Sequence, residues 1–227
     1  MLRTDRRERA AAVAADWRVV SRRRRDTLCR VNKPLIATTL GLIGQRLDAS
    51  LAAISGLRDQ LHGIASVGDL IVGRFHAGAS LYTAGNGGSA AQALHLAEEL
   101  IGRYRTSRRA LPAVCLNADP TALTCISNDF GFENVFARQC EALIKAGDVF
   151  IALSTSGNSA NITNALAIAR ARGGATIGLL GNDGGKARAL CDHAIVIPGS
   201  DSALIQDAHQ VIIHLLCEIV EAAFCRA

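Results

Sequence analysis

From residue 79 onward, short apolar runs alternate with segments that carry apolar residues at helical spacing. Each run is apolar at nearly every position, as in a strand that is covered on both faces. The expected strands are residues 79–84, 113–116, 149–153, 176–180 and 194–197. Buried strands separated by helices form a parallel sheet, and right-handed crossovers place helices on both sides. The pattern therefore predicts an α/β protein with a three-layer, doubly wound, parallel five-stranded sheet.

Ahead of the first expected strand, residues 34–74 have a helical pattern in which leucine and isoleucine recur at intervals of three to seven. We expect two extra N-terminal helices here, with a break near 66–68. Such a mostly apolar helix pair is consistent with burial between subunits. A last helix is expected from about residue 203 to residue 224.

Composition and charge separate the start of the chain from the rest. Apolar residues make up 49% of the 227 residues and aromatic residues only 4%, which favours a helix-rich α/β domain. Residues 1–33 hold 11 Lys and Arg against 4 Asp and Glu, whereas residues 34–227 hold 14 against 16. We interpret 1–33 as an Arg-rich extension, either a helix with a solvated basic face or a disordered arm, and 34–227 as one domain. Because the domain is not basic, nucleic acid is not an expected partner.

Other features indicate a cytoplasmic protein without a membrane partner. No uninterrupted apolar run reaches membrane-spanning length, and no apolar stretch of a secretory signal follows the first arginines. The seven cysteines are odd in number, lack any C-x-x-C pair, and mostly lie among apolar residues. Reduced, buried thiols of a cytosolic protein have this pattern.

A Gly-rich turn, GNGGS at 85–89, follows the first expected strand and opens a helix. Glycines allow close approach of a ligand to the backbone, and free N–H groups at a helix N-terminus attract anions. Ser89 is either the N-cap or a ligand hydroxyl. Along the same helix, His95 and Glu99 share one face and can share a metal ion or a proton. Each fragment alone is often only a turn or a surface pair.

A second polar loop, STSGNS at 154–159, follows the third expected strand. Its hydroxyls, its glycine and the helix after it favour a phosphate cradle. The loop lacks the lysine and spacing of a P-loop, so a nucleoside triphosphate is not the expected ligand. Ligands of doubly wound sheets collect beyond the carboxyl ends of the strands, where both loops fall.

The last helix contributes polar side chains to an otherwise apolar segment. Gln206 and His214 are eight residues apart, about 80° from the same bearing, and both can lean toward one site. His209 lies on a neighbouring bearing. Periodicity does not choose between His209 and His214, and a histidine in an apolar helix is more often a core residue.

Taken together, these motifs make the chain resemble the sugar isomerase (SIS) domain family, and within it the phosphoheptose isomerases, over roughly residues 35–226. The motifs are GNGGSAAQALHLAEELIGRYR at 85–105, SNDFGF at 127–132, STSGNS at 154–159 and IQDAHQVIIHLLCEIVE at 205–221. The resemblance implies a cytoplasmic homotetramer with active sites between subunits and one zinc ion per subunit. It also implies isomerisation of sedoheptulose 7-phosphate to D-glycero-D-manno-heptose 7-phosphate, which supplies heptose for lipopolysaccharide core or related glycans.

Matching the family position by position gives the expected site. The zinc ligands would be His95, Glu99, Gln206 and His214. The substrate contacts would be Asn86, Gly87, Gly88, Ser89, Glu99, Asn128, Asp129, Ser154, Thr155, Ser156, Ser159 and Gln206. Glu99 and His214 are our candidates for the acid–base pair that moves a proton between neighbouring carbons through an enediol. A residue that binds zinc tightly is a poorer proton carrier, so these roles compete and their division stays open.

Two positions depart from the family. Leu204 stands where the family usually has Arg, and Asp207 stands where it usually has Glu. Loss of a cation near the ligand would weaken phosphate or hydroxyl recognition unless Arg103 or Arg105 compensates. An isomerase of another ketose phosphate is therefore an alternative.

Two rival functions come from other branches of the family. One is a non-catalytic SIS protein that binds the bacterial replication initiator. Such proteins typically lack the helical glutamate and the final histidine, whereas Glu99 and His214 are both present here. The other is a sugar-phosphate-sensing regulatory domain attached to a DNA-binding module. The segment before Pro34 is too short for a convincing helix-turn-helix.

Overall fold

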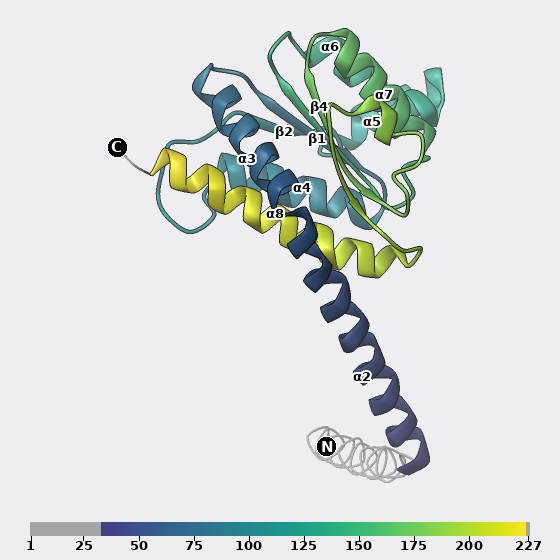
Figure 1. Cartoon of the computed structure of the whole chain (residues 1–227). Helices are drawn as coiled ribbons and strands as arrows, with labels where there is room; N and C mark the ends of the chain where they lie inside the picture. The colour runs from purple at the N-terminus through teal and green to yellow at the C-terminus, as the bar shows by residue number, and fades with distance from the viewer. Residues whose placement is uncertain (1–32, 226–227) are drawn as a thin grey trace, which may run out of the picture. The chain divides into compact units, whose positions relative to one another are not determined.

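The computed structural model describes residues 33–225, and Figure 1 shows the whole chain. The Arg-rich extension expected at 1–33 lies outside the described residues except for Lys33. The chain divides into two units, Met1–Asp48 and Ala49–Ala227. The described residues of the first unit belong to helix α2, on which apolar side chains such as Leu40 and Leu47 are exposed.

From residue 81 onward, every strand is followed by one or more helical segments, as the sequence pattern predicted. Their bounds are α2 (Lys33–Ser55), η1 (Gly56–Gln60), α3 (Leu61–His76), β1 (Leu81–Gly85), α4 (Gly88–Ile101), β2 (Ala113–Cys115), α5 (Pro120–Phe130), η2 (Phe132–Asn134), α6 (Ala137–Leu143), β3 (Val149–Ser154), α7 (Ala160–Ala171), β4 (Ala175–Gly181), η3 (Arg188–Leu190), β5 (His193–Ile197) and α8 (Ser202–Phe224). Aspartate caps stand at the start of α5 and α8. Asp119 accepts hydrogen bonds from backbone N–H groups at the start of α5, and Asp201 does so for α8.

The sheet has five parallel strands in the order β2-β1-β3-β4-β5. Leu81 of β1 pairs with Ala113 on one side and with Val149 on the other. Strands β1, β3 and β4 are buried at every position because helices cover both faces of the sheet. The predicted five-stranded, doubly wound fold is confirmed.

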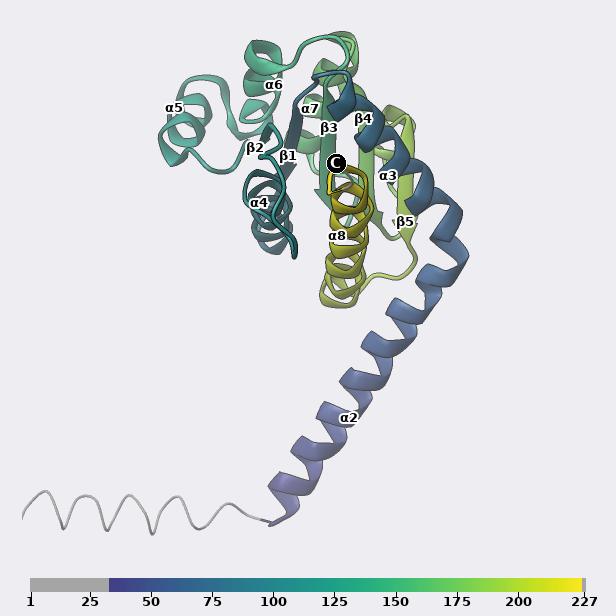
Figure 2. The same cartoon turned by 90° about the vertical axis from the view of Figure 1, so that its left-hand side faces the viewer.

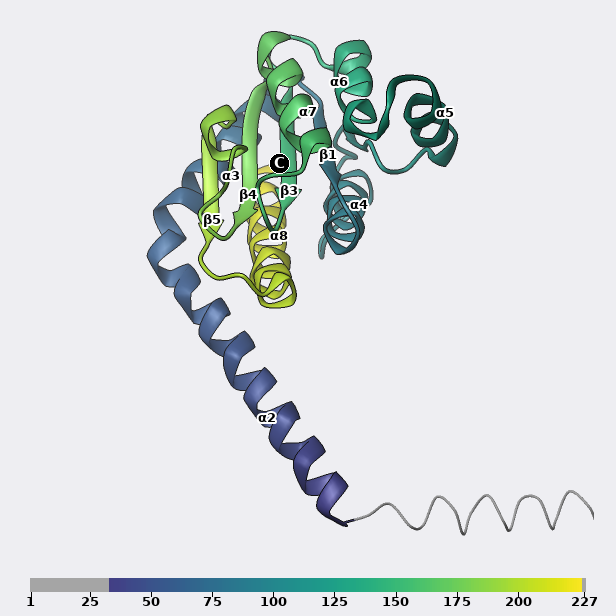
Figure 3. The same cartoon turned by 90° about the vertical axis from the view of Figure 1, so that its right-hand side faces the viewer.

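Two hydrophobic clusters fill the spaces on either side of the sheet. One cluster packs α3, α4 and α8 against the sheet, and the other packs α6 and α7 against the opposite face. Figures 2 and 3 show the strands between these two helical layers. Neighbouring residues of β3 serve opposite clusters, since Ile151 belongs to the first and Phe150 to the second.

The expected helix break near 66–68 was wrong. The interruption is η1 at Gly56–Gln60, and α3 runs without a break through Gly68. Gly68 is a packing residue, because a Cβ there would lie 2.7 Å from Cδ1 of Ile219 on α8. Helices α3 and α8 therefore approach closely at a position that the sequence pattern suggested was a turn.

Among the described residues, α8 is the one helix whose length and apolar composition would allow it to cross a membrane. Its apolar side chains belong to the core, and Ile205, Ile212 and Leu216 are all buried. A core helix passes such a test as readily as a membrane span, so α8 is weak support for membrane insertion.

Both predicted anion loops lie where the winding of the sheet reverses. Strands β1 and β3 are neighbours in the sheet although β2 lies between them in the sequence. The turn after β1 leads into α4, and the loop after β3 leads into α7. The carboxyl ends of these two strands form the switch point at which doubly wound proteins bind ligands.

Candidate active site

The Gly-rich turn after β1 has a backbone that requires glycine. Gly87 has a φ of 55° and is the N-cap of α4, without a capping bond from a side chain. A Cβ on Gly85 would lie 2.5 Å from the backbone of Ser89. Ser89 itself is buried within the first turn of α4. Of the two roles left open for Ser89, the structure therefore excludes that of N-cap.

The loop after β3 is folded by its own hydroxyls. The Ser154 Oγ accepts a hydrogen bond from the Gly157 N–H at 3.0 Å, and the Ser156 Oγ accepts one from the Asn158 N–H at 3.2 Å. A hydroxyl that accepts still has its own O–H to donate. Ser159 is the N-cap of α7 and makes no capping bond with its side chain. The loop thus presents hydroxyl donors beside a helix N-terminus, which suits an anion.

The Gly-Gly turn at 184–185 supports this loop. Gly157 packs so closely on the Gly184 carbonyl that a side chain has no room there. The Asn158 Oδ1 also accepts a hydrogen bond from the Lys186 N–H at 3.1 Å. A Gly-Gly pair after a strand was too common a signal to reveal this contact.

Helices α4 and α8 lie side by side and run parallel. A Cβ on Gly88 would lie 2.6 Å from the Gln206 Nε2, and the Gln92 Nε2 donates to the Gln206 backbone oxygen at 2.7 Å. Further along both helices, the Nε2 atoms of His95 and His214 are 3.2 Å apart. The contacts advance in the same direction on both helices, which gives the seam between them a fixed register.

A group of potential metal ligands lies at the histidine pair. The His95 Nε2 is 3.8 Å from the Glu99 Oε1, and the His95 Nδ1 is 3.4 Å from the Glu98 Oε1. Ligand atoms of His95, Glu98 and Glu99 all lie within 4.8 Å of one another. Two nitrogens on one tetrahedral zinc ion are about 3.3 Å apart, which is close to the separation of the two histidine Nε2 atoms. The donor set therefore fits a zinc ion.

Other expected site residues are not at the histidine pair. The Gln206 amide contacts Gly88, and eight residues of helix, about 12 Å, separate Gln206 from His214. Asn128 and Asp129 are exposed at the end of α5, where the Asn128 Nδ2 donates to the Asp129 Oδ1 at 2.7 Å. Among the residues that the structure describes, no hydrogen bond joins these two residues to either anion loop or to the histidines.

The structure distinguishes the two candidate histidines of α8. His209 is fully buried, and its Nε2 lies 3.3 Å from the Leu180 carbonyl oxygen of β4. Burial lowers the pKa of His209 from 6.5 to about 4, so its imidazole is neutral. His214 is only partly buried and faces His95. His209 is thus a core residue, and His214 is the histidine available for chemistry.

Sequence reasoning missed residues that contact His214. The Gln210 Nε2 lies 3.0 Å from the His214 Nε2, and the ring centroids of Tyr104 and His214 are 5.7 Å apart. The spacing of Gln206, Gln210 and His214, four residues at each step, was a readable signal that these residues share one helix face. The contact of Tyr104 had no such signal, because it comes from the segment that follows α4.

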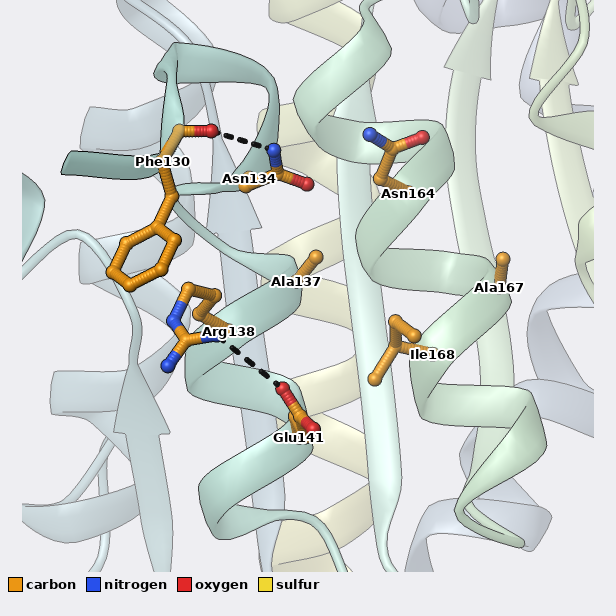
Figure 4. Close-up of a pocket in the computed structure, with 8 residues that line it drawn as sticks. All are labelled: Phe130, Asn134, Ala137, Arg138, Glu141, Asn164, Ala167 and Ile168. Carbon is orange, nitrogen blue, oxygen red and sulfur yellow. Dashed lines mark hydrogen bonds and ion pairs between the residues drawn. The ribbon is translucent and has the colours of Figure 1, made fainter. Parts of the chain in front are cut away.

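Larger cavities in the described part of the chain lie away from the histidine pair. Figure 4 shows one of about 440 Å³ between α6 and α7, in the helical layer opposite α4 and α8, where the Arg138 guanidinium lies over the Phe130 ring at 3.9 Å. Another, of about 580 Å³, is largely apolar and is lined by Leu204 together with Ala52 and Ala53. Leu204, at the position where the resemblance leads us to expect Arg, therefore lines a largely apolar cavity whose lining also includes Asp59 and Asp201.

Comparison with known proteins identifies the family. The SIS domain family matches residues 47–181. A phosphoheptose isomerase of Pelobacter propionicus is 51% identical over 166 residues, covering 73% of this chain and 88% of the relative. One of Geobacter sulfurreducens is 47% identical over 180 residues, covering 79% of this chain and 95% of the relative.

Solved structures of the same enzymes share the fold. A phosphoheptose isomerase from Neisseria gonorrhoeae has 35% identity and a TM-score of 0.74, covering 83% of this chain and 99% of that chain. One from Francisella tularensis has 29% identity and a TM-score of 0.78, covering 81% and 98%. The chain therefore belongs to the SIS domain family and, within it, to the phosphoheptose isomerases, and it is an isomerase enzyme.

Proposed function

We propose that the protein converts sedoheptulose 7-phosphate to D-glycero-D-manno-heptose 7-phosphate, using Glu99 and His214 as its acid–base pair. The observation that carries the proposal is the approach of His95 and His214 to 3.2 Å beside Glu99. His95 and Glu99 lie on α4, which begins at the switch point, and His214 lies on α8, which packs alongside α4. The names of the relatives support the same reaction.

The reaction moves two protons. A base removes a proton from the hydroxyl-bearing carbon next to the carbonyl, and the proton returns to the former carbonyl carbon of the enediol. A second proton passes from one oxygen to the other. Glu99, whose side chain is 15% exposed, is suited to the carbon-bound proton, and the His214 imidazole is suited to the oxygen-bound one. The Arg108 guanidinium donates to the backbone oxygen of Glu99 at 2.7 Å and so holds the last turn of α4.

Zinc is part of the proposal. His95, Glu99 and His214 would hold the ion, and Gln206 completes the ligand set that the family resemblance predicts. Gln206 joins them only if its amide leaves Gly88. A bound zinc ion would polarise the carbonyl and hydroxyl oxygens of the substrate as a Lewis acid. Glu98, 3.4 Å from the His95 Nδ1, would accept the second ring N–H of His95 and direct its Nε2 lone pair toward the site.

The phosphate would bind in the loop of residues 154–159, where Ser154, Thr155, Ser156 and Ser159 offer hydroxyls beside the α7 N-terminus. The turn of residues 86–89 would bind the sugar hydroxyls. Phosphate binding far from the reacting carbons supplies energy that orients them. The loops follow neighbouring strands, which supports their contact with opposite ends of one substrate.

We also propose a cytoplasmic homotetramer that supplies heptose for lipopolysaccharide-type glycans. Apolar side chains on α2 are exposed in the single chain, and burial between subunits would cover them. They are Ile36, Leu40, Leu42, Ile43, Leu47 and Leu51. Asn128 and Asp129 would then contact substrate at a site shared between subunits.

Turnover of sedoheptulose 7-phosphate by the purified protein, with and without added zinc, tests this function. We expect a metal-dependent aldoheptose phosphate product, and we expect Glu99→Gln to lower kcat by roughly 10²–10⁴. Zinc binding without turnover would contradict the assignment of sedoheptulose 7-phosphate as the substrate and point to another ketose phosphate. If the protein neither binds zinc nor turns over the substrate, the result would favour a non-catalytic protein, such as the SIS proteins that bind the replication initiator.

A further inference from the structure

Two asparagines join the turn after β1 to the start of α7. The Asn86 Nδ2 donates to the Asn161 Oδ1 at 2.9 Å, and the Asn161 Nδ2 donates to the Asn86 Oδ1, also at 2.9 Å. Asn86 lies between β1 and α4, and Asn161 is the second residue of α7. The two side-chain amides therefore form a closed pair with two hydrogen bonds.

This amide pair spans the switch point of the sheet. Strands β1 and β3 are neighbours, with Gly85 paired to Leu153, and each strand leads into one of the two anion loops. On the other side of β1, the Asn117 Oδ1 accepts from the Gly85 N–H at 3.1 Å and its Nδ2 donates to the Gly85 oxygen at 3.0 Å. The carboxyl end of β1 is thus held from both sides by asparagine amides.

Burial separates the Asn161 side chain from any substrate. Asn161 is 2% exposed, so its amide stays satisfied only while Asn86 faces it. Removing the Asn86 side chain would leave the buried Asn161 amide without these hydrogen bonds, which costs folding free energy. The Asn86 amide is consequently turned toward Asn161. An Asn86 contact with substrate, as the family resemblance predicts, would then come from the backbone.

We propose that Asn86 and Asn161 are positioning residues that form a clamp, which fixes the spacing between the turn of residues 85–89 and the loop of residues 154–159. This inference rests on the proposed function, in which the two segments bind opposite ends of one sugar phosphate. A fixed spacing orients the reacting carbons relative to the anchored phosphate, and small misplacements of bound groups lower reaction rates strongly.

The test compares Asn86→Ala, Asn161→Ala and the double variant. The clamp predicts that each single variant lowers kcat by roughly 10–100-fold and that the double variant is no worse, because either change breaks both hydrogen bonds. Competitive inhibition by inorganic phosphate should stay within about twofold of wild type, since phosphate alone occupies one loop. Asn164→Ala is the matched control, because Asn164 also lies on α7 (Figure 4). Its Nδ2 donates instead to the Glu133 backbone oxygen at 3.1 Å.

Three results would overturn the clamp. A much larger loss in Asn86→Ala than in Asn161→Ala would show direct substrate contact by the Asn86 side chain. Weaker inhibition by phosphate in step with the loss of kcat would show collapse of the loop. Unchanged kcat in Asn161→Asp, which keeps the size but lacks the N–H donor, would show that only space filling matters. Absence of turnover in wild type would instead contradict the proposed function.

Discussion

The two faces of α8 put similar residues to different uses. The face toward the sheet buries Ile205, Ile212 and His209 in the core. The face toward α4 carries Gln206 and His214, which contact Gly88 and His95 across the seam. Two histidines only five residues apart therefore differ in environment. The element packed against each face of α8 decides whether a polar side chain lies in the core or in the site. The composition of the helix alone does not show which element that is.

The largest effect is expected from His214→Ala on the face toward α4. If His214 moves a proton, its removal should lower kcat/KM by roughly 10²–10⁴. Because His214 is only partly buried, we expect the free energy of unfolding to change by less than about 1 kcal/mol. Steady-state kinetics and denaturant unfolding measure the two quantities. Activity within tenfold of wild type would contradict the proton-transfer role.

His209→Ala tests the opposite face with the same substitution. Removing a fully buried imidazole leaves a cavity and removes the polar contact with the Leu180 carbonyl oxygen. The free energy of unfolding should therefore fall by about 2–4 kcal/mol. The kcat of the folded fraction should stay within about threefold of wild type. Urea unfolding and kinetics below the unfolding midpoint give both numbers. A loss of kcat as large as that of His214→Ala would mean that the two faces are not separate.

The pH dependence of stability sharpens the same contrast. The pKa of His209 is about 4 in the folded protein against about 6.5 when unfolded, so only the unfolded state takes up the proton between these values. The stabilisation from the neutral His209 is complete above pH 6.5 and is lost as pH falls toward 4. Between pH 7 and pH 4.5 this loss is about 2.5 kcal/mol. His209→Leu cannot take up a proton, so between pH 7 and pH 4.5 its free energy of unfolding should fall by about 2.5 kcal/mol less than that of wild type. Equal losses for the two proteins in urea unfolding would contradict the assignment of His209 as a buried, neutral core residue.

The sequence predicts the fold and part of the site, but it does not predict the contrast between the two faces of α8, for physical reasons. Strands that are apolar at every position predicted the fold, because only a sheet covered on both faces accepts them. The spacing of His95 and Glu99 predicted a shared face, since helix geometry is local. The choice between His209 and His214 depends on which neighbour faces each residue, and the family resemblance supplied it. The Asn86–Asn161 pair joins residues 75 apart, a contact that no local pattern encodes.

Further along the α4-facing side, Glu221 offers a smaller test. Its buried carboxylate accepts hydrogen bonds from the backbone N–H groups of Arg105 and Thr106. These bonds anchor the segment of residues 102–109, whose Tyr104 ring lies beside His214. Glu221→Ala should lower the free energy of unfolding by about 1–3 kcal/mol.

The released segment should also be cleaved faster by trypsin, because it contains four arginines. Mass spectrometry of the fragments locates the cut. Glu221→Gln keeps one acceptor oxygen and should show an intermediate cleavage rate. Equal cleavage of wild type and both variants would mean that Glu221 does not hold the segment.

The smallest effect is expected from Gln210→Met, which keeps the side-chain length but removes the amide 3.0 Å from the His214 Nε2. The Gln92 Nε2 lies 3.4 Å from the Gln210 Oε1, an arrangement that turns the Gln210 Nε2 toward the histidine. Without that amide, the imidazole loses one of its two polar contacts, and kcat should fall by roughly 3–10-fold while KM changes little. Gln139→Met, which removes an amide from α6 in the opposite helical layer, is the matched control. A kcat equal to that of the control would show that His95 alone orients His214 and that the polar row on this face of α8 ends at the histidine pair.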